Sequence, residues 1–187
     1  MTTAEAMLLV TLLLALGVWL TWLRASRLDR LHRKVASTRA TLDNQLVRRA
    51  AVAAELASSG LLDPVSSVLV AEGAFEALEA RDWEGSQREE VESSLSQTLR
   101  TVLADPGEVA ALAASGEGGR LLEELARAWY RVQLARRFHN EAVAQAQRVR
   151  RKLAVRVFRL AGHAPVPQTV EIDDSWPEGL PSPGNVT

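Results

Sequence analysis

Two groups of polar residues are the part of this sequence best suited to specific recognition chemistry. Each group sets arginines beside a carboxylate or an amide, one near residue 45 and the other near residue 140. A partly buried guanidinium pairs well with a carboxylate through two parallel hydrogen bonds. The simplest interpretation is a set of interhelix hydrogen bonds and ion pairs that fixes the register of two helices. The alternative is a polar groove that binds a partner or a small anion. The residues are Asp43, Arg48, Arg49, Arg136, Arg137, Asn140 and Glu141.

The residue types on which most enzymes depend are absent or scattered. The chain has 187 residues and no Cys, which excludes disulfides, thiolate metal sites and Cys nucleophiles. His32, His139 and His163 lack the spacing of a metal site. The Gly-rich residues 116–119 lack the Lys of a phosphate loop, and the Ser residues show no Ser-His-Asp arrangement. We therefore expect a non-enzymatic protein with no cofactor and no metal.

Charge is nearly balanced overall but uneven along the chain. The formal net charge is -1, so we expect no nucleic-acid partner. Residues 24–49 and 148–159 are basic, whereas residues 72–92 are acidic. We expect the acidic stretch to serve solubility, or else to meet a basic partner or the basic end of a second copy.

The element that must position these groups is the apolar run AMLLVTLLLALGVWLTWL, residues 6–23, which has no ionisable side chain. As a helix it covers roughly 27 Å, close to the ~30 Å hydrocarbon core of a bilayer. A cleaved signal peptide needs basic residues before the run, and a buried core helix normally shows a polar stripe. Neither feature is present, so we expect a single membrane span.

Flanking charge sets the expected orientation of this span. Lys and Arg follow it and none precedes it, and positive residues stay cytoplasmic. We expect the amino terminus outside and the chain from residue 24 onward inside. An antiparallel last helix would bring its basic end back to the inner leaflet, where anionic headgroups relieve the repulsion. The expected lipid contacts are Arg24, Arg27, Arg30, Arg33, Lys34, Arg150, Arg151 and Arg156.

The rest of the chain predicts a bundle of helices over residues 24–162. Apolar steps of three and four predict one helix from the membrane to about Ser58, ended by Gly60. Asp63-Pro64 predicts the next helix start. Ser86 and Glu89 have the spacing of a capping box for a third helix.

The later part of the bundle contains shorter and longer elements. A short helix is expected over residues 108–113, a flexible loop over 115–119 and a long helix over 120–162. Val65, Val68, Leu69, Phe75 and Leu78 continue the apolar pattern of the second helix.

These elements define the expected fold class as all-α, with one transmembrane helix continuing into an antiparallel bundle of long helices. Residues 1–23 form the amino-terminal segment with the span, and residues 24–162 form the cytoplasmic bundle. Residues 163–187 are Pro-rich and are expected to be extended and partly disordered. Within this tail, Val170 and Ile172 are suited to packing on the bundle.

Three stretches resemble one known family. Residues 42–49 read LDNQLVRR, residues 135–143 read ARRFHNEAV, and residues 158–174 read FRLAGHAPVPQTVEIDD. Together they resemble the LemA family, which carries an Asp-x-Gln-Leu-x-Arg-Arg motif, an Arg-Arg-aromatic-Tyr-Asn-acid-Ala-Val run and a closing Phe-Glu-Ile. His139 stands where the family has Tyr, and Val170 where it has Phe, as in a diverged member. The resemblance implies a membrane-anchored cytoplasmic helical bundle of bacteria and no particular reaction.

The function that these features favour is an anchored interaction or scaffold module at the inner face of a bacterial cell membrane. The alternative is an accessory or regulatory subunit of a membrane enzyme or protease. In either case the expected partners are the membrane, possible anionic lipid headgroups, and a protein partner or a second copy of the chain.

Overall fold

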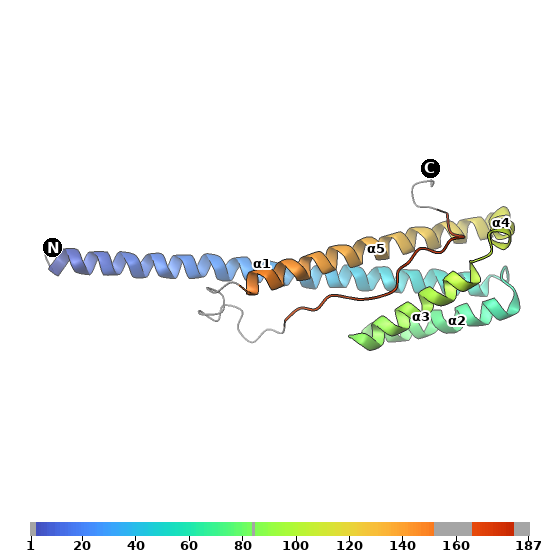
Figure 1. Cartoon of the computed structure of the whole chain (residues 1–187), viewed down its shortest axis with the longest axis horizontal. Coiled ribbons are helices and arrows are strands. Elements are labelled where there is room, and N and C mark those ends of the chain that lie inside the picture. The colour runs from blue at the N-terminus through green and yellow to red at the C-terminus, as the bar shows by residue number, and fades with distance from the viewer. Residues whose placement is uncertain (1–2, 84, 152–165, 182–187) are drawn as a thin grey trace. The chain divides into compact units, whose positions relative to one another are not determined.

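The regular elements that the structure describes are all helices, which confirms the all-α class (Figure 1). This computed structural model describes residues 3–83, 85–151 and 166–181, with only some of the side chains between residues 3 and 28. The elements in order are α1 (Thr3–Ser58), α2 (Pro64–Glu79), the 3-10 helix η1 (Ala80–Asp82), α3 (Ser86–Val102), α4 (Pro106–Ala114) and α5 (Gly116–Arg150).

Helix α1 confirms the prediction of one helix ending at Ser58. Its last turn is closed by serine hydroxyls, because Ser58 Oγ donates to Ala54 O at 3.0 Å and Ser59 Oγ donates to Leu56 O at 2.7 Å. Gly60 then takes φ +73°, a left-handed conformation that glycine adopts without strain. Among the residues that the structure describes, no helix combines the length and apolar character needed to cross a membrane.

Aspartate and proline set two of the helix starts. Asp63 Oδ1 accepts hydrogen bonds from Val65 N at 3.0 Å and Ser66 N at 3.1 Å, as the Asp63-Pro64 signal predicts. Asp105 does the same for α4, which starts at Pro106. These two carboxylates each satisfy backbone N–H groups that the first turn of a helix leaves unpaired.

The predicted capping box of α3 is wrong. Ser86 is already the first residue of α3, and the cap position is held by Gly85 at φ +72° with no side-chain hydrogen bond. A hydroxyl one position inside the helix does not reach the unpaired N–H groups in the way that a cap residue does.

The loop expected over residues 115–119 is instead the first turn of α5. Ser115 Oγ accepts from Gly118 N at 3.0 Å, and Gly118 is buried against the end of α4. A Cβ at Gly118 would lie 2.2 Å from Leu112 O, and one at Gly119 would lie 2.9 Å from Ala113 O. These glycines therefore allow α4 and α5 to meet closely rather than supplying flexibility. Of the expected long helix, residues 152–162 lie outside the described residues.

The chain divides into two compact units. The first contains residues 1–38 and 140–169, and its buried apolar side chains among the described residues are Leu31, Ala142, Val143 and Ala146. The second contains residues 39–139 and 170–187 and holds the main core, where α1, α2, α3 and α5 contribute buried Leu, Val and Ala around Trp129. A smaller cluster in the second unit consists of Leu42, Leu46, Val132, Ala135, Val170 and Ile172.

Helix α2 packs into the core through its small residues, and most of its larger apolar residues lie on the opposite, exposed face. Its buried residues are the small Val70, Ala74 and Ala77, which pack in the main core. The residues that continue the apolar pattern in the sequence, Val65, Val68, Leu69 and Phe75, are exposed. Alanines allow α2 to approach its neighbours closely, so the larger side chains are left on the outside.

Candidate functional site

The Arg49 guanidinium is fully buried and joins three helices. Arg49 comes from α1 and is 0% exposed. Its Nη1 donates to Ser96 Oγ at 2.8 Å, and its Nη2 donates to Glu92 Oε2 at 2.9 Å and to Glu92 O at 3.0 Å, both on α3. The guanidinium carbon lies 4.9 Å from the ring centroid of Trp129 on α5, a cation–π contact. Arg49 therefore fixes the register of α1, α3 and α5.

Two more arginines and one more carboxylate surround this pair. Arg88 is buried, with Nη1 3.5 Å from Asp43 Oδ1 and Nε 3.9 Å from Glu92 Oε1. Arg39 Nε lies 3.2 Å from the same Asp43 oxygen. Burial raises the pKa of Glu92 against the attraction of Arg49 and Arg88, and burial lowers the pKa of Arg49.

The partners Glu92, Ser96 and Arg88 were not among the candidates from the sequence, although a signal exists. They recur at steps of four beside the buried apolar residues Val91, Leu95 and Leu99 of α3. Polar residues at core spacing in an amphipathic helix indicate a buried polar network, provided that a partner of opposite charge lies on another helix.

A second polar site forms where the carboxyl-terminal segment lies on the bundle. Arg136 of α5 makes a bidentate pair with Asp174, with Nε–Oδ2 and Nη2–Oδ1 distances of 2.8 Å each. The Asp174 carbonyl accepts from Trp129 Nε1 at 3.0 Å and from Gln133 Nε2 at 2.7 Å. Asp173 pairs with Arg100 of α3, and its N–H donates to Ser93 Oγ at 3.0 Å. The two aspartates thus hold an extended segment to α3 and α5.

Apolar anchors flank the two aspartates. Val170 and Ile172 are buried in the smaller cluster, so the expected packing of these two residues is present. Trp176 and Leu180 pack on the main core, so residues 175–181 are held on the bundle, in contrast to the partly disordered tail expected there. Gly179 permits a close approach, since a Cβ there would lie 2.4 Å from Leu103 O. We call residues 170–180 the strap.

The remaining polar candidates do not join these two sites. Arg48, Arg137 and Glu141 are exposed, and Asn140 is half-buried. The seven residues chosen from the sequence therefore separate into four groups: the half-buried Asp43 and the buried Arg49 in the helix-joining network, Arg136 at the strap, the half-buried Asn140, and the exposed Arg48, Arg137 and Glu141. Arg49–Glu92 is an ion pair between two helices, and Arg136–Asp174 is an ion pair between a helix and the strap.

The eight residues predicted to contact lipid all belong to the first unit, and the structure describes the side chains of five of them. Arg30, Arg33, Lys34 and Arg151 are exposed, Arg150 is half-buried, and Arg33 pairs with Asp29 at 2.9 Å. Gln147, Arg150, Arg151 and Val166 line a shallow depression of about 410 Å³. The side chains of Arg24 and Arg27, and residue Arg156, lie outside the described residues.

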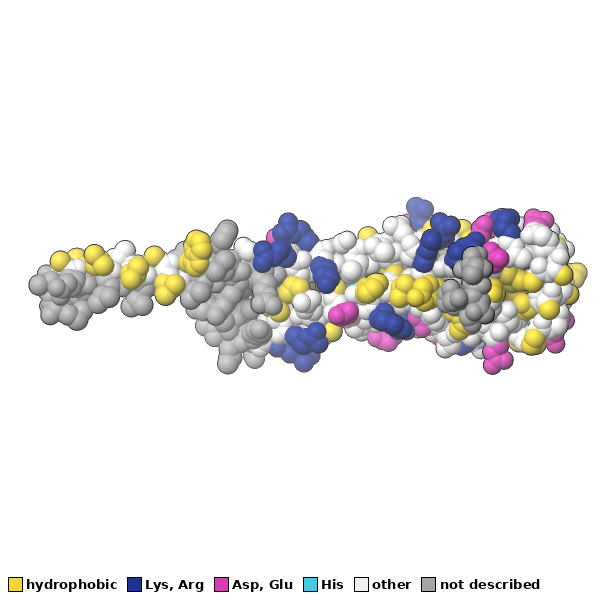
Figure 2. Space-filling model, turned by 90° about the horizontal axis from the view of Figure 1, so that it is seen from above, with side chains coloured by type: hydrophobic (Ala, Val, Ile, Leu, Met, Phe, Trp, Pro, Cys, Tyr) yellow, Lys and Arg dark blue, Asp and Glu magenta, His cyan; other side chains and the backbone are white. Residues whose placement is uncertain are grey.

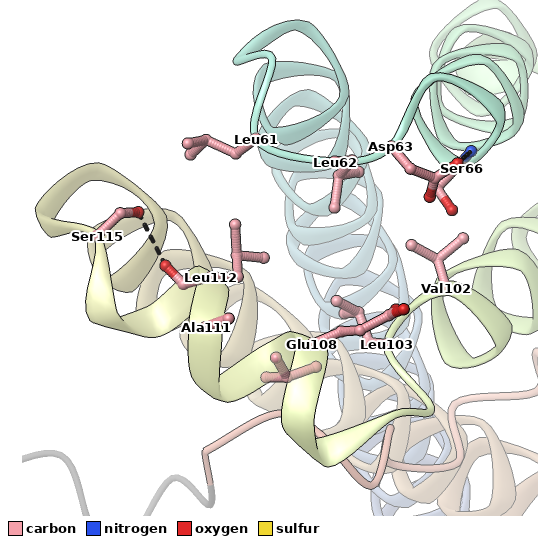
Figure 3. A pocket seen from close by; sticks show the side chains of 11 residues that line it. Leu61, Leu62, Asp63, Ser66, Val102, Leu103, Glu108, Ala111, Leu112 and Ser115 are labelled. Atoms are coloured by element: carbon pink, nitrogen blue, oxygen red, sulfur yellow. Dashed lines mark hydrogen bonds between the residues drawn. The ribbon is translucent and has the colours of Figure 1, made fainter.

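A pocket of about 400 Å³ with a mixed polar and apolar lining lies in the second unit, where the α1–α2 and α3–α4 connections meet α4 (Figure 3). Asp63 and Glu108 are the acidic residues of its lining, and Ser115 Oγ donates to Leu112 O at 2.9 Å. Its volume lies in the range of ligand pockets, and its lining combines apolar with acidic side chains. The apolar lining residues are Leu61, Leu62, Val102, Leu103, Val109 and Leu112.

Metal binding has no support in the described residues, where no group of three or more His, Asp or Glu is placed to hold an ion. His163 lies outside these residues.

The comparisons with known proteins give no match: no family model, no curated protein and no solved structure matches the chain. The resemblance to the LemA family therefore stays a prediction from the sequence.

Proposed function

We propose that the chain is a non-enzymatic interaction or scaffold module, anchored to a bacterial cell membrane by residues 6–23, with its helical bundle in the cytoplasm. The observation that carries this proposal is the exposure of the apolar side chains at the amino-terminal end of α1. Met7, Leu8, Val10, Leu12, Leu16 and Trp19 are each more than half exposed.

These side chains are distributed around the helix. At about 100° per residue they cover roughly two thirds of the circumference, so they do not form the one-sided stripe of a helix that packs on protein. Figure 2 shows this end of α1 with hydrophobic side chains and no charged side chain among the described atoms. A helix that is apolar on most sides is stable in water only when something covers it, and lipid covers all sides at once.

The charge that follows supports the orientation. Arg30, Arg33 and Lys34 are exposed after the apolar end, and Arg151 is exposed in the same compact unit. Positive residues are retained on the cytoplasmic side and attract anionic headgroups.

The alternative is an accessory or regulatory subunit of a membrane enzyme or protease. The pocket in the second unit favours it, because a cavity of about 400 Å³ next to the α1–α2 connection offers a concave surface for a segment of a partner. Mild crosslinking followed by copurification separates the two: the interaction module recovers copies of itself or several partners, and the subunit recovers one defined enzyme.

Cell fractionation of two matched variants tests the anchor. Leu12→Arg combined with Leu16→Arg places two charges in the apolar run, and Ala40→Arg combined with Ala51→Arg adds the same two charges at exposed positions of α1 beyond it. We expect the wild type and the Ala40→Arg/Ala51→Arg variant in the membrane pellet and the Leu12→Arg/Leu16→Arg variant in the supernatant. Recovery of the wild type in the supernatant would refute the anchor.

A further inference from the structure

The outer face of α2 is an unpartnered apolar and acidic surface. Val65, Val68, Leu69 and Phe75 are between 49% and 68% exposed. At about 100° per residue they lie on one side of the helix, opposite the buried Val70, Ala74 and Ala77. We call this surface the α2 face, and its exposed acidic residues are Glu72, Glu76 and Glu79.

The apolar side chains of this face are interleaved with its glutamates. At about 100° per residue, Glu72, Glu76 and Glu79 fall between Phe75 and Leu69 around the helix, so the outer side is mixed rather than uniformly apolar. Residues 64–79 contain no Lys or Arg, so every formal charge on α2 is negative. A surface that covers it should therefore offer apolar side chains and basic groups together.

The outer side of α5 has that chemistry. Tyr130 and Phe138 are 41% and 57% exposed, and Arg131 and Arg137 are exposed beside them on the same side of the helix. The neighbouring Arg127 is already paired with Glu123 at 3.2 Å, so it adds no free charge. We call Tyr130, Arg131, Leu134, Arg137 and Phe138 the α5 face.

We propose that the α2 face of one copy packs on the α5 face of a second copy. The apolar side chains of α2 meet Tyr130, Phe138 and the half-buried Leu134, and the glutamates of α2 meet Arg131 and Arg137. Pairing of two α2 faces is disfavoured, since it would set their glutamates against their own copies. The contact joins two different surfaces, so it is heterologous and builds rings or open chains.

This proposal rests on the proposed function as an interaction module, and it names a second copy of the chain as the partner. A single helix-on-helix contact is small beside the roughly 1,200–2,000 Å² of a stable interface. We therefore expect a weak contact, and covalent trapping at high protein concentration is the suitable way to detect it.

Disulfide trapping tests the contact directly, because the chain has no Cys of its own. Leu69→Cys lies in the α2 face and Leu134→Cys in the α5 face, and neither removes a charge. Ser94→Cys, at an exposed position of α3, is the matched control. The full chain with each substitution is purified in detergent, mixed pairwise and oxidised.

We expect a covalent dimer when the Leu69→Cys and Leu134→Cys chains are mixed, at several times the yield of either chain mixed with Ser94→Cys. Covalent dimers of the Leu69→Cys chain with itself would show that two α2 faces pair. The same yield from mixtures that contain the Ser94→Cys chain would show that the disulfides form by random collision. Either result, or no dimer from the mixture, overturns the proposal.

Charge reversal gives a second test in chains that fold normally. Glu72→Lys with Glu76→Lys on the Leu69→Cys chain should reduce trapping to the control yield. When that chain is mixed instead with a Leu134→Cys chain that also carries Arg131→Glu and Arg137→Glu, the charges are again opposite and the yield of trapped dimer should be restored. Trapping that is unaffected by the reversal overturns the charge pairing. The trapping experiment and the cell fractionation test different proposals. A chain that is found in the membrane pellet but gives no trapped dimer refutes only this contact. A chain that gives the trapped dimer but is found in the supernatant refutes only the anchor.

Discussion

Arg49 shows how one side chain in this bundle ties three helices together. Its charge is removed from water, and that cost is offset only because Glu92, Ser96 and the ring of Trp129 all lie within reach. A buried pair of this kind adds little net stability compared with apolar residues of the same size, but removal of one partner leaves a buried charge alone. Its role is to specify which helix faces meet.

Arg49→Met should lower the free energy of unfolding by about 3–5 kcal/mol, because Glu92 is then left buried without its main cation. The double variant Arg49→Met/Glu92→Leu should recover most of this loss. Urea denaturation followed by circular dichroism measures both. A single variant within about 1 kcal/mol of the wild type would contradict the structural role.

Glu92 should also make stability depend on pH. Its pKa in the folded chain is raised above the usual value of 4.5 by burial, so the folded state holds this proton more tightly than the unfolded chain does. The stability that it contributes is complete below pH 4.5 and is lost as the pH rises through the raised pKa. Arg49 stays charged throughout this range.

Glu92→Gln removes this titration and leaves the other carboxylates in place. We expect the free energy of unfolding of the wild type to fall relative to Glu92→Gln as the pH rises above about 4.5. Denaturation of the two proteins from this pH to neutrality is the measurement. A constant difference between them, or a relative gain by the wild type, would show that the pKa of Glu92 is not raised.

At the scale of elements, the helix boundaries follow local chemistry and are largely predictable. Asp63-Pro64 and Asp105-Pro106 mark helix starts because the carboxylate and the fixed proline φ act on their own neighbours. Gly118 was misread because its role depends on a carbonyl of α4 that the local sequence does not reveal. The same holds for Glu92 and Asp174, whose arginine partners lie 43 and 38 residues away in the chain.

Gly118→Ala should destabilise the junction of α4 and α5. The added Cβ would lie 2.2 Å from Leu112 O, so the helices must shift apart, at a cost of about 1–3 kcal/mol. Gly116→Ala is the matched control, because nothing lies within 4 Å of its Cβ, and it should keep or slightly raise stability. Equal effects of the two substitutions on thermal unfolding would count against close packing at Gly118.

The strap depends on its aspartates. Burial alone would raise the pKa of Asp173, but the hydrogen bond from Ser175 N and the Arg100 guanidinium hold it below the usual value. Its contribution is therefore present above pH 3.8 and is lost as the pH falls through the lowered pKa.

Asp174→Asn should weaken the strap, since it breaks the bidentate pair with Arg136 and costs about 1–2 kcal/mol. The exposed Glu171→Gln removes a charge two residues from Asp173 without a contact of this kind and serves as the control. Limited proteolysis should cut residues 170–180 of the Asp174→Asn variant faster than those of the wild type, and it should cut the Glu171→Gln variant at the wild-type rate. Equal cleavage of both variants would mean that the ion pair does not hold the strap.

At the scale of the whole molecule, an apolar helical end is followed along the chain by a basic region and by a bundle with faces of opposite charge. The sequence was sufficient to predict the all-α class and the apolar run, because both depend on composition and periodicity. It did not predict the α2 face, because the choice of buried side depends on which neighbour can approach the small residues of that helix. The proposed contact between copies makes sense of that exposed face, and the proposed anchor makes sense of the exposed end of α1.

The most direct test of the account is protease digestion of sealed, inverted inner-membrane vesicles that carry the full chain. We predict that the bundle is digested and that a short amino-terminal fragment stays in the vesicles after an alkaline carbonate wash. The full chain in the wash supernatant, or a bundle protected until detergent is added, would contradict the anchor or its orientation.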